Sequence, residues 1–161
     1  MNTHSSLISS ALRTIEIENR AVAELLNRVD AGFVKACEII LASKGRVVVI
    51  GMGKSGHIGK KIAATLASTG TTAMYVHPAE ASHGDIGMIA ADDVVLAISN
   101  SGTTSEILSL LPVLKRKGVP LISLTGDKQS EFAMAASANL DVRRGLPRQP
   151  WLIPTVYHRL S

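Results

Sequence analysis

Short runs of β-branched and aliphatic residues alternate with segments of helical periodicity along most of the 161-residue chain. The clearest run, residues 46–50, is apolar after its arginine, as buried parallel strands are, and Ile58, Ile62 and Leu66 follow it at helical spacing. Further strands are predicted at residues 72–76, 94–98, 119–124 and, as a short fifth, 140–142, and further helices at 8–29, 33–41, 107–117 and 130–138. Strands that alternate with helices form right-handed βαβ units. The pattern therefore predicts an α/β fold: a parallel sheet with helices on both faces, preceded by two N-terminal helices.

Length and composition predict a soluble, cytoplasmic protein of one domain. Hydrophobic residues make up 46% of the sequence, which favours a packed core over disorder. No apolar run approaches the roughly 20 residues that a membrane-spanning helix needs. Residues 1–10 lack the basic start and apolar stretch of a secretory signal. The single cysteine, Cys37, cannot form an internal disulfide, which fits a reducing compartment.

The charge of the chain argues against a nucleic-acid partner. The formal net charge is +4, and all of it comes from the arginines of residues 143–161, where no acidic residue occurs. Residues 1–142 are therefore neutral overall, and they lack the basic balance of a domain that binds a phosphate backbone. The basic run at residues 115–117 fits a solvated helix end that complements the helix dipole.

Two loops rich in glycine and hydroxyl groups, residues 51–57 and 99–106, each follow a predicted strand and lead into a helical pattern. Amides at a helix N-terminus carry partial positive charge, and glycine allows close approach of a ligand, so such loops favour a phosphate ester. For any single hydroxyl the alternative is a helix N-cap. The predicted phosphate-binding residues are Gly53, Ser55, Ser99, Ser101, Thr103 and Thr104.

Nucleotide-binding motifs fit the first loop less well. Residues 51–56 match G-x-G-x-x-G, but the acidic residue that should hold a ribose would fall near Val76 or His77, and neither is acidic. A P-loop would need glycine at the position of Val48. The connection formed by residues 77–85 is predicted to be a long irregular loop at the same edge of the sheet.

Residues 49–59, 76–87 and 97–102, together with Glu106, closely resemble the sugar isomerase (SIS) domain of arabinose-5-phosphate isomerases. The resemblance covers roughly residues 5–142. It implies a three-layer sandwich with a five-stranded parallel sheet, a homotetramer, and interconversion of D-arabinose 5-phosphate and D-ribulose 5-phosphate on the route to the lipopolysaccharide sugar Kdo. It implies neither a metal nor another cofactor.

Aldose–ketose isomerisation through a cis-enediol needs one base and a group that stabilises the developing oxyanion. With the resemblance, Glu106 is predicted to be the base, Lys54 the electrostatic stabiliser, and His83 the group that opens the sugar ring. The structural alternatives are a carboxylate that complements a helix dipole, a solvated lysine, and a histidine that orders its loop. His57 and His77 flank the same region, and a direct role in the reaction is less expected for either of them.

Residues 1–142 are predicted to form the SIS domain, and residues 143–161 a divergent, basic, proline-rich tail. The family continues with a second active-site glutamate, a later histidine and CBS domains, none of which this sequence contains, so poor activity and a tendency to associate are expected. One hypothesis for the divergence is a shifted reading frame. The alternative functions are a non-catalytic regulatory phosphosugar-binding domain, an isomerase for another sugar phosphate and, more distantly, a nucleotide-binding oxidoreductase.

Overall fold

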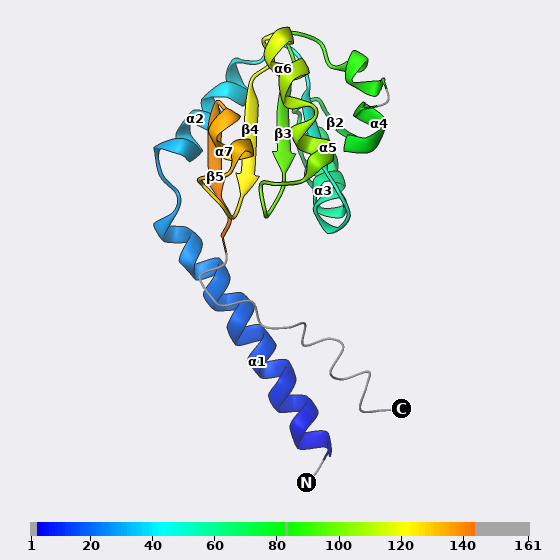
Figure 1. Ribbon diagram of the computed structural model, residues 1–161. Helices are drawn as coiled ribbons and strands as arrows, with labels where there is room; N and C mark the ends of the chain where they lie inside the picture. The colour runs from blue at the N-terminus through cyan, green and yellow to red at the C-terminus, as the bar shows by residue number, and fades with distance from the viewer. Residues whose placement is uncertain (1–2, 83, 144–161) are drawn as a thin grey trace. The chain divides into compact units, whose positions relative to one another are not determined.

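The computed structural model describes residues 3–82 and 84–143 (Figure 1). The predictions for His83 and for the tail from residue 144 onward lie outside the described residues. The described chain divides into two units, residues 3–28 and residues 29–143. Among the described helices, none combines the length and apolarity needed to cross a membrane.

The first unit consists of α1 (Thr3–Ala23) and a 3-10 turn, η1 (Glu24–Asn27). Leucine and isoleucine recur along α1 at helical spacing, and Leu12 and Ile15 are exposed. An ion pair of 2.9 Å between Arg28 Nη2 and Glu24 Oε2 bridges the end of the unit. The single helix predicted over residues 8–29 is therefore an α-helix that tightens into a 3-10 turn.

The second unit is built on a five-stranded sheet in which every strand pair is parallel. The strand order is β2-β1-β3-β4-β5. Their bounds are β1 (Val47–Gly51), β2 (Ala73–Val76), β3 (Val94–Ile98), β4 (Leu121–Thr125) and β5 (Ala138–Asp141). The five-stranded parallel sheet is thus confirmed, with boundaries within two residues of the predicted strands.

Alternate residues of the central strands enter two separate cores. Val47 and Val49 face α2 (Ala31–Ala42) and α3 (Lys54–Ser68), whereas Val48 and Ile50 face the opposite layer. That layer contains α4 (Pro78–Ser82), α5 (Ser105–Leu108), α6 (Leu111–Lys117) and α7 (Glu131–Ala135). Helices cover both faces of the sheet (Figure 1), which confirms the three-layer sandwich.

Three predicted segments differ in the structure. Residues 77–85 are not irregular throughout, because α4 begins at Pro78 and η2 (Asp85–Met88) follows. The helix predicted over 107–117 is two helices, since Pro112 lacks an N–H and is tolerated only in a first turn, here that of α6. The helix predicted over 130–138 ends at Ala135, because Ala138 already belongs to β5.

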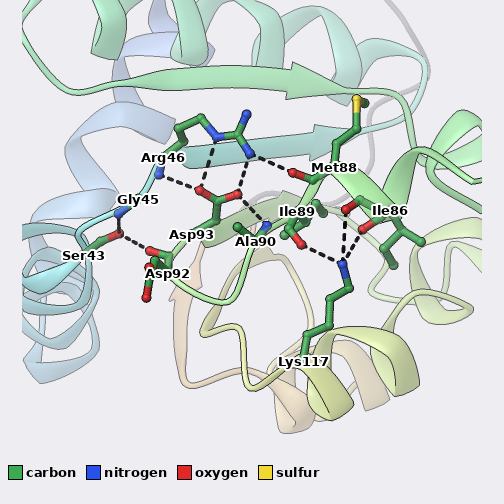
Figure 2. A network of polar contacts seen from close by, with 11 residues as sticks. Ser43, Gly45, Arg46, Ile86, Met88, Ile89, Ala90, Asp92, Asp93 and Lys117 are labelled. Carbon is green, nitrogen blue, oxygen red and sulfur yellow. Dashed lines mark hydrogen bonds and ion pairs between the residues drawn. The ribbon is translucent and has the colours of Figure 1, made fainter.

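A buried carboxylate fixes the connection into β3 at the amino edge of the sheet (Figure 2). Asp93 is 2% exposed, and its oxygens accept bonds from the backbone N–H of Arg46 (2.7 Å) and of Ala90 (2.9 Å) and from Arg46 Nη2 (2.9 Å). Burial alone would raise the pKa of Asp93, but these hydrogen bonds outweigh it and the pKa lies below its ordinary value. Arg46 Nη2 also donates to the Met88 carbonyl at 2.7 Å.

The basic end of α6 is more than a solvated helix terminus. Lys117 Nζ donates to the carbonyls of Ile86 (3.0 Å), Gly87 (3.4 Å) and Ile89 (2.7 Å) (Figure 2). These carbonyls lie in and just after η2, so Lys117 gives the end of this short helix a charged donor in addition to the Ile89 N–H, which bonds the Ile86 carbonyl at 3.3 Å. The expectation of a merely solvated lysine is wrong for this residue.

Candidate active site

The two glycine-and-hydroxyl loops leave neighbouring strands at the carboxyl edge of the sheet. β2 lies on one side of β1 and β3 on the other, so the chain order reverses between β1 and β3. In the β1–β3 ladder Gly51 pairs with Ile98, which places Met52 and Ser99 at the start of adjacent loops. Open α/β sheets bind ligands at such a switch point. The fold therefore brings the two predicted phosphate loops together.

The first loop turns sharply from β1 into α3. Gly53 has φ +56°, a left-handed conformation that favours glycine, and it occupies the N-cap of α3. Lys54 is the first residue of α3 and is exposed, and Ser55 follows it half-buried. Because α3 has 15 residues, its dipole places partial positive charge at this turn. The local geometry suits an anion.

The second loop is ordered by its own hydroxyl groups. Ser99 is 2% exposed, its Oγ lies 2.8 Å from Thr104 Oγ1, and it accepts a bond from Gly102 N at 3.1 Å. Ser101 Oγ accepts bonds from Thr103 N (3.3 Å) and Thr103 Oγ1 (3.0 Å). Thr104 is the N-cap residue of α5, but its side chain makes no capping bond. For Thr104, the N-cap alternative is therefore not what the structure shows.

Gly102 anchors this loop against α7. Its φ of +67° is left-handed, and a Cβ added there would overlap the side chain of Ser130 and lie 3.1 Å from Thr125 Oγ1. Ser130 caps α7, since its Oγ accepts from Ala133 N at 3.3 Å. The position of the loop thus depends on a residue without a side chain.

We expect Gly102→Ala to destabilise the protein by about 2–3 kcal/mol, because it combines a left-handed φ with the overlap against Ser130. Urea unfolding followed by circular dichroism measures the change. Gly87→Ala is the matched control, since a Cβ there meets nothing within 4 Å, and it should change stability by less than about 0.5 kcal/mol. Equal stability of the two variants would contradict the anchoring role.

Glu106 lies in the first turn of α5, directly after the second loop. Its own backbone N–H, then the Ser105 hydroxyl that donates to Oε2 at 2.9 Å, and then the nearby His77 lower the pKa of Glu106 below its ordinary value. The carboxylate is therefore ionised at neutral pH. An ionised, solvent-accessible carboxylate beside a predicted phosphate loop can accept a proton from a bound ligand.

His77 and Asp141 also lie at the carboxyl ends of strands. His77 follows β2, its Nδ1 accepts the Ala79 N–H at 3.3 Å, and it lies near Glu106. Asp141 ends β5, is buried, and forms ion pairs with Arg143 Nε (3.0 Å) and Lys128 Nζ (3.5 Å).

Other features of the described residues lie away from these loops. A hollow of about 440 Å³ opens at the opposite, amino edge of the sheet, where Ser43, Lys44 and Asp92 contribute to its wall. Within residues 3–82 and 84–143, no three His, Cys, Asp or Glu side chains gather closely enough to bind a metal ion.

Comparison with known proteins identifies the family of this chain. Residues 40–146 match the SIS domain family. Arabinose 5-phosphate isomerase KdsD of Pseudomonas aeruginosa is 62% identical over 156 residues, which cover 96% of this chain and 48% of that protein. KdsD of Escherichia coli K12 is 56% identical over 129 residues, 80% of this chain and 39% of that protein. The chain therefore spans about half the length of these curated relatives, or less.

A solved structure shows the same fold. The protein of E. coli CFT073 determined in complex with arabinose 5-phosphate has 40% sequence identity and a TM-score of 0.85, and the match covers 99% of this chain and 87% of that one. The family match covers well over half of the sequence. The chain belongs to the SIS domain family.

Proposed function

We propose that this chain is a phosphosugar aldose–ketose isomerase domain that interconverts D-arabinose 5-phosphate and D-ribulose 5-phosphate. The observation that carries the proposal is the meeting of two hydroxyl-bearing loops at the switch point of the sheet, with the ionised Glu106 directly after one of them. The names of the curated relatives and the sugar-phosphate complex of the structural neighbour support this choice of substrate.

The phosphate of the sugar is held by the first turn of α3 and by the second loop. Gly53 and Ser55 supply one side of this site, and the hydroxyls of Ser99, Ser101, Thr103 and Thr104 supply the other. Fixing the phosphate places the far end of the open-chain sugar, with its carbonyl, beside Glu106. The binding energy of the phosphate is thereby used to orient the reacting carbons.

In the reaction, the Glu106 carboxylate removes the proton from C2 of the aldose, the electron pair forms the C1–C2 double bond, and the carbonyl π pair moves onto the C1 oxygen to give the anion of a cis-enediol. A proton moves from the C2 hydroxyl to the C1 oxygen, and Glu106 returns its proton to C1 to give the ketose. Lys54 stabilises the negative charge that develops on the oxygens. His83 opens the furanose ring before this step, because a neutral imidazole can both donate and accept a proton.

The test is incubation of the 161-residue chain with arabinose 5-phosphate and detection of ribulose 5-phosphate by NMR. We expect conversion, and we expect it to be slower than by a full-length relative, since residues 143–161 depart from the family pattern. Binding of arabinose 5-phosphate without any conversion would favour the regulatory, non-catalytic alternative. Faster conversion of a different sugar phosphate in a parallel panel would change the substrate assignment.

We extend the proposal to the assembly and the cellular role of the protein. The family resemblance supports a homotetramer that acts in the cytoplasm and supplies Kdo precursors, with residues 1–142 as the SIS domain and residues 143–161 as a tail. Light scattering during size-exclusion chromatography tests the assembly, for which we expect about four times the 17.0 kDa mass of one chain.

A further inference from the structure

Tyr75 of β2 reaches across to the end of β1 on the face covered by α3. In the ladder it pairs with Val49, and its partly buried ring packs into the core on that face. Its hydroxyl extends two residues further along β1 and donates to the carbonyl oxygen of Gly51 at 2.6 Å. Gly51 is the last residue of β1 and the first of the phosphate turn. The hydroxyl therefore bonds the backbone where the strand becomes the turn.

Two glycines of α3 leave room for this side chain. A Cβ on Gly56 would lie 2.7 Å from Tyr75 Oη, and a Cβ on Gly59 would lie 3.3 Å from the ring. Glycine inside a helix costs roughly 1 kcal/mol relative to alanine, so a glycine retained there usually has a packing reason. Here the tyrosine is one such reason, beside the Gly51 carbonyl, 2.9 Å from a Cβ on Gly56, and Val49 Cγ1, 3.3 Å from a Cβ on Gly59. The ring lies directly against the first two turns of α3.

The hydrogen bond to Gly51 constrains more than one atom. The described peptide bonds are trans, and a trans peptide is planar, so the N–H of Met52 points opposite to the Gly51 carbonyl. Holding that carbonyl therefore sets the direction in which the chain enters the turn toward Lys54. Burial, and then the nearby charge of Glu80, raise the pKa of Tyr75 above its ordinary value, so the phenol keeps its proton at neutral pH.

We infer that Tyr75 is a positioning residue for the phosphosugar site: its hydroxyl sets the geometry of the turn formed by residues 51–55. This inference rests on the proposed function for the identity of the ligand. It goes beyond that function because Tyr75 acts through the backbone of Gly51 and is not itself assigned a contact with the sugar. Lys60 Nζ, 5.2 Å from the ring centroid, further restrains the ring from the α3 side.

The decisive variant is Tyr75→Phe in the full 161-residue chain, which removes the hydroxyl and keeps the ring. Thr69→Val is the matched control, since it removes a hydroxyl that donates to the carbonyls of Thr65 (2.9 Å) and Leu66 (3.1 Å) at the other end of α3. Calorimetric titration with arabinose 5-phosphate gives the affinity, and amide hydrogen exchange by NMR reports on residues 51–55.

We expect Tyr75→Phe to weaken the binding of arabinose 5-phosphate about fivefold, the effect of losing one hydrogen bond, and to speed amide exchange at residues 51–55. Thr69→Val should change neither readout, although both variants should lower the melting temperature slightly. Unchanged affinity in Tyr75→Phe overturns the inference. So does loss of the folded state in Tyr75→Phe, because the hydroxyl would then be a structural group.

The outcomes separate this inference from the proposed function. A wild-type chain that does not bind arabinose 5-phosphate contradicts the proposed function. The exchange measurement then decides by itself whether Tyr75 sets the geometry of the turn. Unchanged amide exchange at residues 51–55 in Tyr75→Phe overturns this role. Faster exchange there in Tyr75→Phe, together with unchanged exchange in Thr69→Val, upholds it.

Discussion

Replacement of Glu106 by glutamine is expected to slow the conversion of arabinose 5-phosphate to ribulose 5-phosphate about 10²- to 10⁴-fold, the usual contribution of a positioned general base. Glutamine keeps the size of the side chain and can still accept the Ser105 hydroxyl bond of 2.9 Å. It cannot accept a proton from carbon. The affinity for the phosphosugar should therefore remain, so the loss should appear in kcat and not in the binding constant measured by titration.

Glu131→Gln is the matched control for this prediction. Glu131 begins α7 as Glu106 lies in the first turn of α5, so both substitutions remove one negative charge from the amino-terminal turn of a short helix. Only Glu106 follows the hydroxyl loop, and only Glu106→Gln should lose activity. An equal, small effect in the two variants would support the dipole interpretation of Glu106.

The pH dependence of the reaction follows from the same carboxylate. Because the pKa of Glu106 lies below its ordinary value, the base is ionised at neutral pH and stays ionised on mild acidification. Activity should therefore fall only as the pH drops through the lowered pKa, below the ordinary value of 4.5. A kcat profile that declines well above this value would assign the acidic limb to another group.

Asp93→Ala is expected to destabilise the protein by about 3–5 kcal/mol, with a fall in melting temperature of roughly 10 °C. The carboxylate is 2% exposed and accepts bonds from two backbone N–H groups and from the Arg46 side chain. Alanine would leave these donors, at the amino edge of the sheet, without their acceptor. Thermal unfolding followed by circular dichroism measures the loss.

Asp92→Ala is the control, because the neighbouring Asp92 is exposed. The bonds from Ser43 Oγ and Gly45 N go to the backbone carbonyl of Asp92, which alanine retains. That variant should change stability by less than about 0.5 kcal/mol.

The sign of the pH effect is set by the lowered pKa of Asp93. Its stabilisation is complete above the unfolded value near 3.8 and disappears as the pH falls through the lower folded value. A wild-type advantage over Asp93→Ala that grows on acidification would contradict this account.

The strands and the positions of the two glycine-and-hydroxyl loops could be predicted because their signals are local. A continuous apolar run such as residues 47–50 is typical of a strand buried on both faces, and all four of these residues are buried. The glycines at positions 51 and 53 mark the turn that follows. Parallel βαβ connections then place every strand-to-helix loop at the same edge of the sheet.

The short helices were not predictable in the same way. α4 contains five residues and α5 four, too few for a 3.6-residue period to show, and the pattern over residues 130–138 overestimates the length of the five-residue α7. They are held by burial of single side chains against the sheet, such as Ala81, Ile107 and Phe132. The irregular loop predicted over residues 77–85 was wrong for this reason, because tertiary packing makes a helix there that the pattern does not reveal.

By itself, the sequence determined the α/β class, the order of the strands and of the longer helices, and the residues predicted to carry phosphate-ester and proton-transfer chemistry. The tertiary structure decided which of them meet. The strand order β2-β1-β3-β4-β5 puts the two loops side by side, Tyr75 bonds Gly51 from 24 residues away, and Asp93 binds Arg46 from 47 residues away. Such contacts depend on how strands pair across the sheet, and no local periodicity records that pairing.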